Sequence, residues 1–247
     1  MALLDKISVS QHRLALLERI EYRLAETAAD REAIYRLRYR AYLKEGAIPA
    51  NSQRLVTDRY DEAPNTWIFG VHFDGQLVSS VRISVGSRQY PLIPSTDVFS
   101  DLIEPWIGEG KVLVDPTRFV ADPLREPNLP DLPYMTLRLA YVACAHFNAD
   151  IGLASVRQEH QAFYRRVFMH RPVSGPRAYP GLLKPICLMA VNFPAMRDQV
   201  ARRYPFLRST QIERHRLFEP LEAASGSVVP LPRAHAMPVL QKDAVRD

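Results

Sequence analysis

Apolar and polar residues recur along the chain with two different periods, and the order of the resulting segments predicts an α/β protein. Strict alternation or a short apolar run is typical of a strand, whereas apolar residues three and four positions apart indicate a helix. The segments with strand character are residues 19–27, 66–73, 76–86, 111–122, 151–157 and 182–193. The segments with helical spacing are residues 1–18, 31–46, 133–150, 158–170 and 194–204. This order predicts a central mixed β-sheet flanked by helices.

Turn and breaker residues refine these predictions. Asp74 and Gly75 separate two alternating segments, as in a tight two-residue hairpin. Asp30 is expected to cap the helix that follows it. Pro116 lies inside a strand pattern and indicates an edge strand or a bulge. Residues 88–110 are interrupted by prolines and are predicted to be a connection with room for one helical turn.

The periodic pattern extends over most of the chain and fades near its C-terminal end. Residues 1–217 are predicted to form a single domain, which is a reasonable length for one core. Residues 218–247 are predicted to be a C-terminal tail, and the extent of its order is left open. Apolar residues make up 47% of the chain and charged residues 24%, as is typical of a soluble globular protein.

The cysteines and the N-terminal segment bear on the cellular compartment. Cys144 and Cys187 both lie in apolar runs and are predicted to be buried free thiols, so no disulfide framework is implied. The N-terminal segment lacks the apolar core of a signal peptide. No apolar run approaches the roughly 20 residues that a membrane-spanning helix needs. We therefore expect a cytoplasmic protein.

The chain is basic, with a formal net charge of +5, and five of its 32 basic residues are lysine, which leaves 27 arginines. Arginine forms paired hydrogen bonds with carboxylates and phosphates. A basic surface of this kind can attract nucleic acid, an anionic membrane or an acidic protein. A coding bias toward arginine explains the composition equally well, so the charge alone does not identify a partner.

Four polar motifs occur in order within residues 35–120. They are Leu37-Arg38-Tyr39-Arg40-Ala41-Tyr42, Asp58-Arg59-Tyr60-Asp61, Gly75-Gln76-Leu77-Val78-Ser79-Ser80-Val81-Arg82 and Asp115-Pro116-Thr117-Arg118-Phe119. In order and separation they resemble the motifs of acyl-homoserine lactone synthases. The chain departs from those enzymes at Ile48, where they usually carry tryptophan, at Asp115, where they carry glutamate, and at Thr117, where they carry serine.

The chain resembles a related family more closely, the N-acyl amino acid synthases, which join a long acyl chain to an amino acid such as tyrosine. The segment from Arg171 to Phe193, with Gly175, Arg177 and Tyr179, is similar to this branch. The resemblance implies a GNAT-like acyltransferase fold, and the predicted element order agrees with it. Two alternatives stay open: a lactone synthase, which would need S-adenosylmethionine, and a non-catalytic GNAT-like module that binds an acyl ligand.

The resemblance also implies that acyl carrier protein is the donor, through the thioester of its 4'-phosphopantetheine arm, with no permanently bound cofactor. The residues add a separate argument. Enzymes of the GNAT fold that bind coenzyme A have a Gly-rich turn after the central strand, whose backbone N–H groups bind pyrophosphate. Residues 119–125 contain no glycine and include Asp122. Carrier proteins are acidic, so an Arg-rich surface would attract one.

The other expected partners follow from the same resemblance. We expect a small amino acid as acceptor, with tyrosine as first choice, and no nucleic acid. A lipid product would allow transient association with a membrane. No metal site is predicted, because His146, His160 and His170 lack the spacing and accompanying ligands of a metal motif.

Attack of an amine on a thioester requires deprotonation of the ammonium group, stabilisation of the oxyanion and release of the thiolate. The catalytic candidates are Asp115, Thr117, Arg118 and Tyr164. Asp115 is the candidate base, directly or through a water, and shares a strand face with Thr117; a structural pair with Arg118 is the alternative. Tyr164 is the candidate proton donor to the thiolate, and packing on the core is its alternative role.

Six further residues are candidates for substrate binding, namely Arg38, Tyr42, Asp58, Asp61, Arg82 and Phe119. The resemblance implies that the charged ones form a network that shapes the donor cleft; alternatively, their ion pairs simply hold the connection at residues 47–65 in place. The helix at residues 134–147 is a candidate wall for an acyl tunnel, although such apolar stripes are more often plain core. Its apolar residues are Met135, Leu139, Tyr141, Val142 and Phe147.

Overall fold

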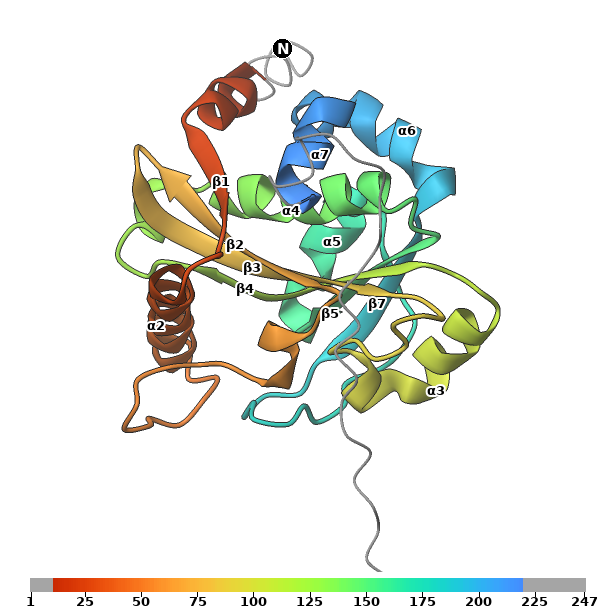
Figure 1. The fold of residues 1–247 in the computed structure, drawn as a ribbon, viewed down its shortest axis with the longest axis horizontal. Coiled ribbons are helices and arrows are strands. Elements are labelled where there is room, and N and C mark those ends of the chain that lie inside the picture. Colours follow the sequence, from red (N-terminus) through yellow and green to blue (C-terminus); the bar gives the residue numbers. More distant parts are fainter. Residues whose placement is uncertain (1–10, 220–247) are drawn as a thin grey trace, which may run out of the picture.

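The computed structural model describes residues 11–219, whose strands form one seven-stranded sheet in the order β1-β2-β3-β4-β5-β7-β6 (Figure 1). The strands are β1 (Ile20–Leu24), β2 (Thr66–Phe73), β3 (Gln76–Gly86), β4 (Leu113–Ala121), β5 (Ile151–Val156), β6 (Arg171–Pro172) and β7 (Cys187–Asn192). Neighbouring strands are antiparallel except β4 and β5, which are parallel. The prediction of a mixed sheet is confirmed.

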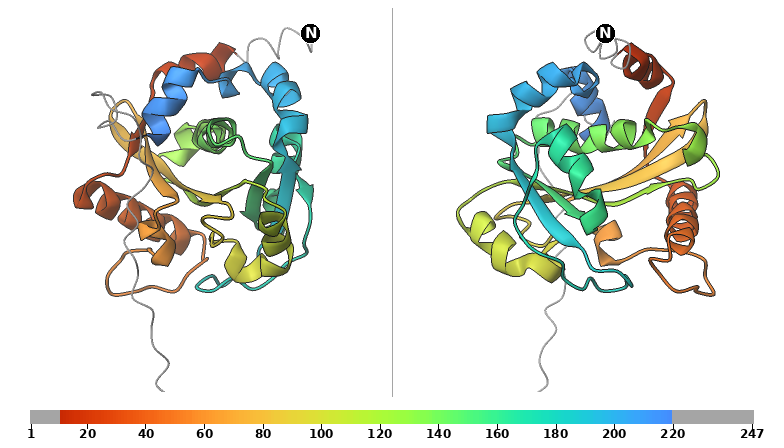
Figure 2. Two further views of the ribbon diagram at one scale, coloured as in Figure 1. Left: turned by 45° about the vertical axis from the view of Figure 1, so that its right-hand side comes forward. Right: turned by 180° about the vertical axis from the view of Figure 1, so that it is seen from behind.

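Helices cover both faces of the sheet (Figure 2). They are α2 (Ala28–Lys44), α3 (Thr96–Gly108), α4 (Leu132–His146), α5 (Gln161–Phe168), α6 (Phe193–Arg203) and α7 (Gln211–Phe218), together with a helical turn region at residues 11–18. α4 packs on β3 and β4 from one side, with α5, α6 and α7 around it, whereas α2 and α3 lie on the other side. Within residues 11–219, no helix has the length and hydrophobicity that crossing a membrane would require.

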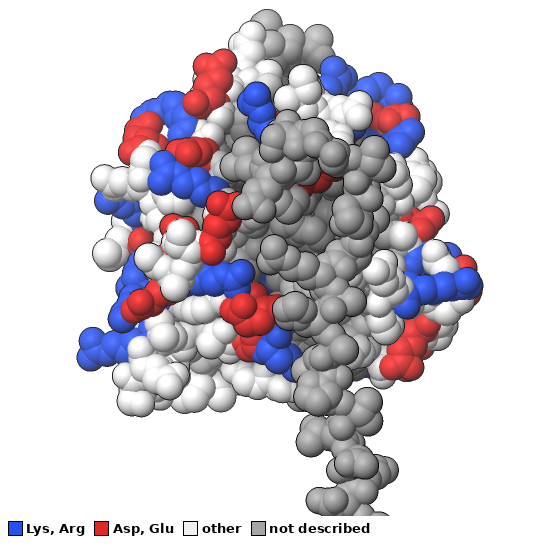
Figure 3. Space-filling view, in the orientation of Figure 1, with Lys and Arg blue, Asp and Glu red and all other residues white. Residues whose placement is uncertain are grey.

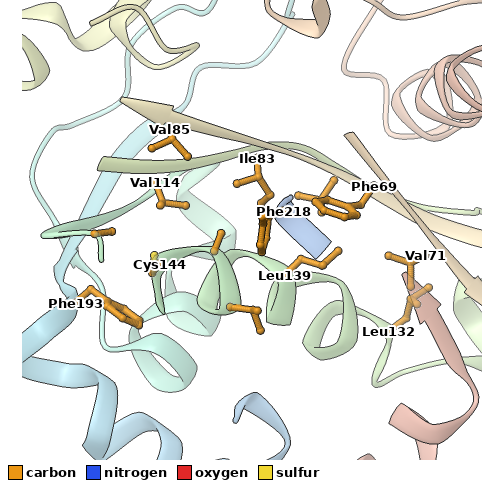
Figure 4. Close-up of a cluster of buried hydrophobic side chains, with 14 of the residues drawn as sticks. Phe69, Val71, Ile83, Val85, Val114, Leu132, Leu139, Cys144, Phe193 and Phe218 are labelled. Atoms are coloured by element: carbon orange, nitrogen blue, oxygen red, sulfur yellow. The ribbon is translucent and has the colours of Figure 1, made fainter. Parts of the chain in front are cut away.

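The main core lies between the sheet and α4 (Figure 4). Phe69, Ile83 and Val114 from the strands pack against Leu139 of α4. All four are fully buried, and burial of a large apolar side chain contributes about 1.5–3 kcal/mol. Phe218 at the end of α7 is 3% exposed and joins the same cluster. This core fixes the position of the sheet against which the polar residues of the opposite face are arranged.

The structure confirms that both cysteines are buried, and it places the start of the predicted tail inside the core. Cys144 and Cys187 are both free and buried. The sequence places the start of the tail at residue 218, but Phe218 belongs to the core. Residues 220–247 of the predicted tail lie outside the described residues.

The β2–β3 hairpin forms as predicted. Asp74 and Gly75 have φ angles of +48° and +76°. Both central residues of a type I′ turn need this left-handed conformation, which glycine adopts without steric cost and aspartate tolerates.

Two local predictions need correction, and two elements were not predicted. The cap of α2 is Thr27 rather than Asp30, because Thr27 accepts from the Asp30 backbone N–H while the Asp30 carboxylate accepts from that of Thr27. This reciprocal pair is a capping box. The connection at residues 88–110 contains the whole of α3 rather than one turn. Its helix is kinked at Phe99, which disguises the period, and it contains Pro105. The sequence also gave no signal for β6 or α7.

Pro116 lies in a central strand, so the prediction of an edge strand is wrong. The alternative, a bulge, is close to what the structure has. Parallel pairing of β4 with β5 covers only Leu113 and Val114 of β4 and stops before Pro116, which has no N–H to donate. The two strands diverge from that point, and this divergence is the feature that creates the candidate site.

Candidate active site

β4 departs from regular alternation at Arg118, whose backbone φ is +54°. Its pairing with β3 shifts between Ser80 and Arg82, which marks a bulge. As a result, Thr117 and Arg118 both reach the charged cluster on the α2 side of the sheet. Phe119 is turned to the opposite side, where it packs against apolar clusters that include α4.

Three arginines and two aspartates from separate segments form a buried network on the α2 side. Arg38 Nη1, from α2, donates to both carboxylate oxygens of Asp61 at 2.9 and 3.0 Å. Arg82 Nη1, from β3, donates to Asp58 Oδ1 at 2.5 Å and to Asp61 Oδ1 at 3.0 Å. Arg118 donates to Asp58 Oδ2 from Nε at 3.1 Å and from Nη2 at 2.6 Å. The set carries one more positive than negative charge.

A short 3-10 helix, η1 (Arg59–Glu62), presents both carboxylates to the arginines. Asp58 caps η1 by accepting from the Tyr60 backbone N–H at 2.9 Å. Asp61 Oδ2 accepts from the Asp58 backbone N–H at 3.0 Å and from Thr57 Oγ1 at 2.9 Å. The network therefore ties the connection at residues 47–65 to the sheet, as the structural alternative predicted, and its role in shaping a donor cleft stays a prediction.

Burial and charge act in opposite directions on these groups. Burial raises the pKa of Asp58, but the Arg82 and Arg118 guanidinium groups outweigh it and hold that pKa well below its usual range. The pKa of Asp61 is likewise lowered, against the effect of burial, by Arg38 and Arg82. Burial lowers the pKa of Arg38. Both aspartates are thus fully ionised near neutral pH, as a buried ion pair requires.

Asp115 is separate from this network. It is 0% exposed and accepts from the Ser95 backbone N–H at 2.9 Å and from Ser95 Oγ at 2.8 Å. Ser95 Oγ also lies 2.7 Å from Ser155 Oγ on β5. Burial raises the pKa of Asp115, and the hydrogen bonds from Ser95 oppose that rise. The predicted alternative of an Asp115–Arg118 ion pair is wrong, because Arg118 pairs with Asp58.

The aromatic candidates divide between the two faces of the sheet. The Tyr42 ring lies 5.8 Å from the Arg118 guanidinium carbon, beside the network. Tyr164 in α5 lies on the α4 side, where it packs against Phe163 and Phe168. Burial raises the pKa of the Tyr164 phenol. Tyr164 and Phe119 are therefore on the opposite side of the sheet from the charged network.

An apolar cavity lies on the α4 side, where β4 and β5 diverge. Its enclosed volume is about 40 Å³, and about 480 Å³ of space is available when the part open to solvent is included. Its floor includes Val114 and Pro116 of β4 and Gly152 of β5, and α4, α5 and α6 supply the walls. Tyr164 and His170 are among the lining residues. An unbranched hydrocarbon chain fits the apolar character of such walls.

The predicted tunnel helix supplies this wall with only part of the expected residues. Tyr141 lines the cavity, together with other residues of α4 that the sequence pattern did not single out: Leu137, Ala140 and Cys144. The other expected residues belong to the packed core, among them Met135, Leu139, Val142 and Phe147.

Sequence reasoning missed several site residues. No recognisable motif marks Ser95, which donates to Asp115, or Ser155, whose hydroxyl meets that of Ser95. The same is true of Thr57, which donates to Asp61. Ser95 lies in the connection that was predicted to be irregular, so only the fold brings it to β4. His170 was considered only as a metal ligand, but it lines the cavity. Within the described residues, no group of three or more His, Cys, Asp or Glu side chains is arranged to hold a metal ion.

Comparison with known proteins gives this geometry a family. Residues 33–192 match the family model described as N-acyl amino acid synthase FeeM. The chain belongs to the FeeM family of N-acyl amino acid synthases. This match covers the charged network, Asp115 and most of the cavity walls. The FeeM family is an acyltransferase family, and the prediction from the four motifs is confirmed at that level.

Solved structures agree with a GNAT-like fold for this FeeM-family chain. The structure of FeeM, an N-acyl amino acid synthase from uncultured soil microbes, is similar with a TM-score of 0.61 and 20% identity, over 75% of this chain and 97% of that one. The CoA-dependent acyl-homoserine lactone synthase MesI is similar with a TM-score of 0.50 and 15% identity, over 78% of this chain and 98% of that one. No curated protein sequence matches the chain.

Proposed function

We propose that this FeeM-family protein transfers a long-chain acyl group from the phosphopantetheine thioester of acyl carrier protein to the α-amino group of an amino acid, with tyrosine as first choice. The observation that carries the proposal is the divergence of β4 and β5. The divergence lies between an apolar cavity on one face of the sheet and a net-positive network on the other. The thioester would lie in the divergence, its acyl chain in the cavity and the acceptor on the charged side.

The charged side suits the carboxylate of an amino acid. Arg118 is the outermost arginine of the network, with a side chain 10% exposed, and its Nη1 makes no hydrogen bond with a described residue. The Arg38 and Arg82 side chains are fully buried. An acceptor carboxylate would complete the charge balance of the network through Arg118, with the Tyr42 ring beside it.

The loop before β7 bounds the same space. Arg177 donates to Asp101 of α3 at 2.6 and 2.9 Å, which fixes one side of the loop. Leu183 N donates to Ala47 O at 2.9 Å, which ties the other side to the end of α2. Between these anchors, Tyr179 packs against the cluster that includes α3. An aromatic side chain at this position supports an aromatic amino acid as acceptor.

The proposed proton path runs through two serines. Asp115 is too deeply buried to touch the acceptor, but Ser155 on the diverging part of β5 is half-buried and is linked to it through Ser95. The acceptor ammonium would pass its proton along these serine hydroxyls to Asp115. The free amine would then attack the thioester carbonyl. A C–N bond forms and the C–S bond breaks as the thiolate leaves and takes up a proton. The raised pKa of Asp115 makes it a stronger base than an exposed aspartate.

Tyr164 stays a prediction as the proton donor to the thiolate. It lines the cavity near the divergence, which supports the assignment. Its raised pKa keeps the phenol protonated but weakens it as an acid. A hydrogen bond from the phenol to the developing thiolate is therefore a more suitable role than complete proton transfer.

The turn after β4 supports a carrier protein as donor. Asp122 Oδ1 accepts from the Leu124 backbone N–H at 2.9 Å, and Asp122 O accepts from those of Arg125 and Glu126, each at 2.9 Å. The N–H groups that would have to bind the pyrophosphate of coenzyme A are already used, and a carboxylate stands beside them. MesI is described as CoA-dependent, so the fold alone is compatible with either donor and the argument depends on this turn.

Charge on the surface restricts where a carrier protein would dock. On the face in Figure 3, basic and acidic side chains are interspersed, and many arginines pair locally, as Arg31 does with Glu62. Arg125, in the turn after β4, and Arg166 of α5, whose Nη2 donates to the Tyr134 hydroxyl at 3.4 Å, form no ion pair with a described residue. These two are the proposed contacts for the acidic carrier.

The decisive experiment is mass spectrometry of lipids from a host that expresses the chain, followed by assays of the purified protein with acyl carrier protein thioesters and a panel of amino acids. We expect an N-acyl amino acid that is absent from the empty-vector host. An acyl-homoserine lactone would instead support the lactone synthase alternative. If neither product forms, the binding-module alternative is favoured.

A further inference from the structure

One polar residue stands out in the wall of the apolar cavity. His170 follows α5 and is 8% exposed. Neither of its ring nitrogens, Nδ1 and Nε2, forms a hydrogen bond of normal geometry with a described residue, although the backbone of Gly152 and Leu153 lies close to the ring. Leaving a buried polar group unsatisfied costs on the order of 1–3 kcal/mol. A chain whose only need were an apolar wall could place leucine or phenylalanine there and avoid this cost.

The position of His170 relates it to the reacting end of the cavity. The ring lies against Gly152, such that a methyl group at the Gly152 α-carbon would come within 3.9 Å of His170 Nε2. Gly152 pairs with Val114 at the last parallel contact before β4 and β5 diverge. The imidazole is therefore beside the part of the cavity nearest the proposed thioester. A methyl group at Gly152 would come within 3.1 Å of Val191 and 3.4 Å of Cys144, so glycine permits the close packing of the wall at this point.

The His170 imidazole is neutral near pH 7. Burial lowers the pKa of His170 to about 4, and the backbone of Leu153 and Gly152 opposes that shift only in part. A neutral imidazole has one N–H donor and one acceptor nitrogen. It can therefore donate to an oxo group or exchange a hydrogen bond with a hydroxyl, without bringing a charge into an apolar cavity.

His170 is one of several polar groups in the cavity wall. The Tyr141 hydroxyl already donates to Arg197 O at 2.6 Å, and the Arg197 guanidinium, which also lines the cavity, pairs with Asp198. Tyr164 stands edge-on to His170, with ring centroids 5.9 Å apart. The Tyr164 hydroxyl is assigned to the thiolate in the proposed function, so His170 is the group left for an oxygen of the acyl chain. The rest of the wall is mostly apolar, as at Leu137 and Phe193.

We propose that the cavity selects acyl chains that carry an oxygen function, a hydroxyl or an oxo group, near the thioester, and that His170 is the residue that recognises this oxygen. The inference rests on the proposed function, because it assigns the cavity to the acyl chain. It adds a substrate class, since an unsubstituted chain would leave the imidazole unsatisfied. Sites with buried polar groups discriminate against ligands that lack the matching polar group, because the buried group is then left without a hydrogen bond.

The test uses the full chain and free fatty acids of equal length, unsubstituted or with a hydroxyl or oxo group at successive positions near the carboxyl end. Calorimetry should find one oxygenated series that binds about three- to tenfold more tightly than the unsubstituted acid, the value of one additional hydrogen bond. In His170→Leu this preference should disappear while the unsubstituted acid binds at least as well. Phe168→Leu, which changes an apolar wall residue, should retain the preference.

A second measurement does not depend on any variant. The ¹⁵N resonances of the His170 ring in the wild-type protein should shift on titration with the preferred oxygenated acid and change less with the unsubstituted one. Binding of all chains without preference, or a preference that survives in His170→Leu, overturns the inference and leaves the proposed function intact. If no fatty acid binds the cavity, the acyl assignment fails, and the inference fails with it.

Discussion

Ser95 holds Asp115 with two hydrogen bonds, one from its backbone N–H and one from its hydroxyl, and the two donors reach different oxygens of the carboxylate. The hydroxyl of Ser95 also meets that of Ser155. A carboxylate with no exposed surface thus gains a path of hydroxyl groups to the diverging part of β5. This arrangement makes the role of Asp115 testable separately from that of the charged network.

Asp115→Asn should lower turnover by about 10²–10⁴, the usual contribution of a positioned acid or base. The amide keeps the size of the carboxylate. It also removes a charge that burial disfavours, as the raised pKa of Asp115 indicates, so the melting temperature should hardly fall. Turnover per folded molecule and the melting temperature decide the matter together. A well-folded variant with near-normal turnover would exclude Asp115 from the chemistry.

Ser155→Ala should lower turnover by at least about tenfold, because it removes the outer hydroxyl of the proposed path. Ser84→Ala is a matched control on the same sheet. The Ser84 hydroxyl is bonded to Thr66 Oγ1 at 2.8 Å and not to Asp115, so its loss costs a comparable hydrogen bond. Equal rates in the two variants would remove the serine path from the mechanism.

Asp61→Asn should lower the free energy of unfolding by about 3–5 kcal/mol, since it leaves the buried guanidinium group of Arg38 without a charged partner and leaves Arg82 with Asp58 alone. Glu32→Gln is the control. It breaks the exposed pair with Arg36 on α2 and should cost less than about 0.5 kcal/mol. Denaturant titration at neutral pH measures both. A small loss in Asp61→Asn would mean that the pair is not buried in solution.

The same aspartates predict how stability depends on pH. The pKa values of Asp58 and Asp61 are lower in the folded protein than in the unfolded chain. Their contribution is therefore fully present above the unfolded pKa of about 3.9 and is lost as the pH falls through the folded values. The denaturant concentration at the midpoint of unfolding should therefore decrease as the pH is lowered through this range. The decline should be shallower in Asp61→Asn, and an unchanged slope would contradict the assignment.

Charge reversal at the proposed carrier contacts should weaken the use of a carrier protein. Arg125→Glu and Arg166→Glu should each reduce kcat/KM for acyl carrier protein thioesters by about three- to tenfold and flatten its dependence on salt. Arg88→Glu, an exposed change near the opposite end of β4, should have little effect. Equal kcat/KM with carrier and coenzyme A thioesters would refute the carrier preference in the wild-type protein.

The sequence predicted the helices, the strands and the charged site residues better than it predicted which residues lie together in space. Motifs identified Arg38, Asp58, Asp61, Arg82 and Arg118, and all of them meet. Alternation along β4 correctly placed Asp115 and Thr117 on one face. Pro116 indicated a bulge as one alternative, but its position at Arg118 could not be predicted, because arginine does not favour positive φ.

The remaining misses have a similar cause. Ser95 and Asp115 are twenty positions apart and meet only because α3 folds the intervening chain back against the sheet. The spacing of residues along a strand or helix carries no information about such a contact. Phe119 was grouped with the charged residues because it follows Arg118 in one motif, and Tyr164 because it was the candidate proton donor, although the sheet separates both from the charged network.

The left-handed residue at position 118 shifts the phase of β4 by one residue halfway along its length. Up to Thr117 the strand sends odd-numbered side chains toward α2, and beyond Arg118 it sends even-numbered ones, such as Val120, to that side. A single strand can therefore carry two consecutive polar residues toward the charged network on the α2 side and still keep an unbroken apolar surface toward α4. Deletion of either Thr117 or Arg118 would restore uniform alternation and keep Phe119 and Val120 on their present sides, but it would remove one of the two polar side chains that face the network.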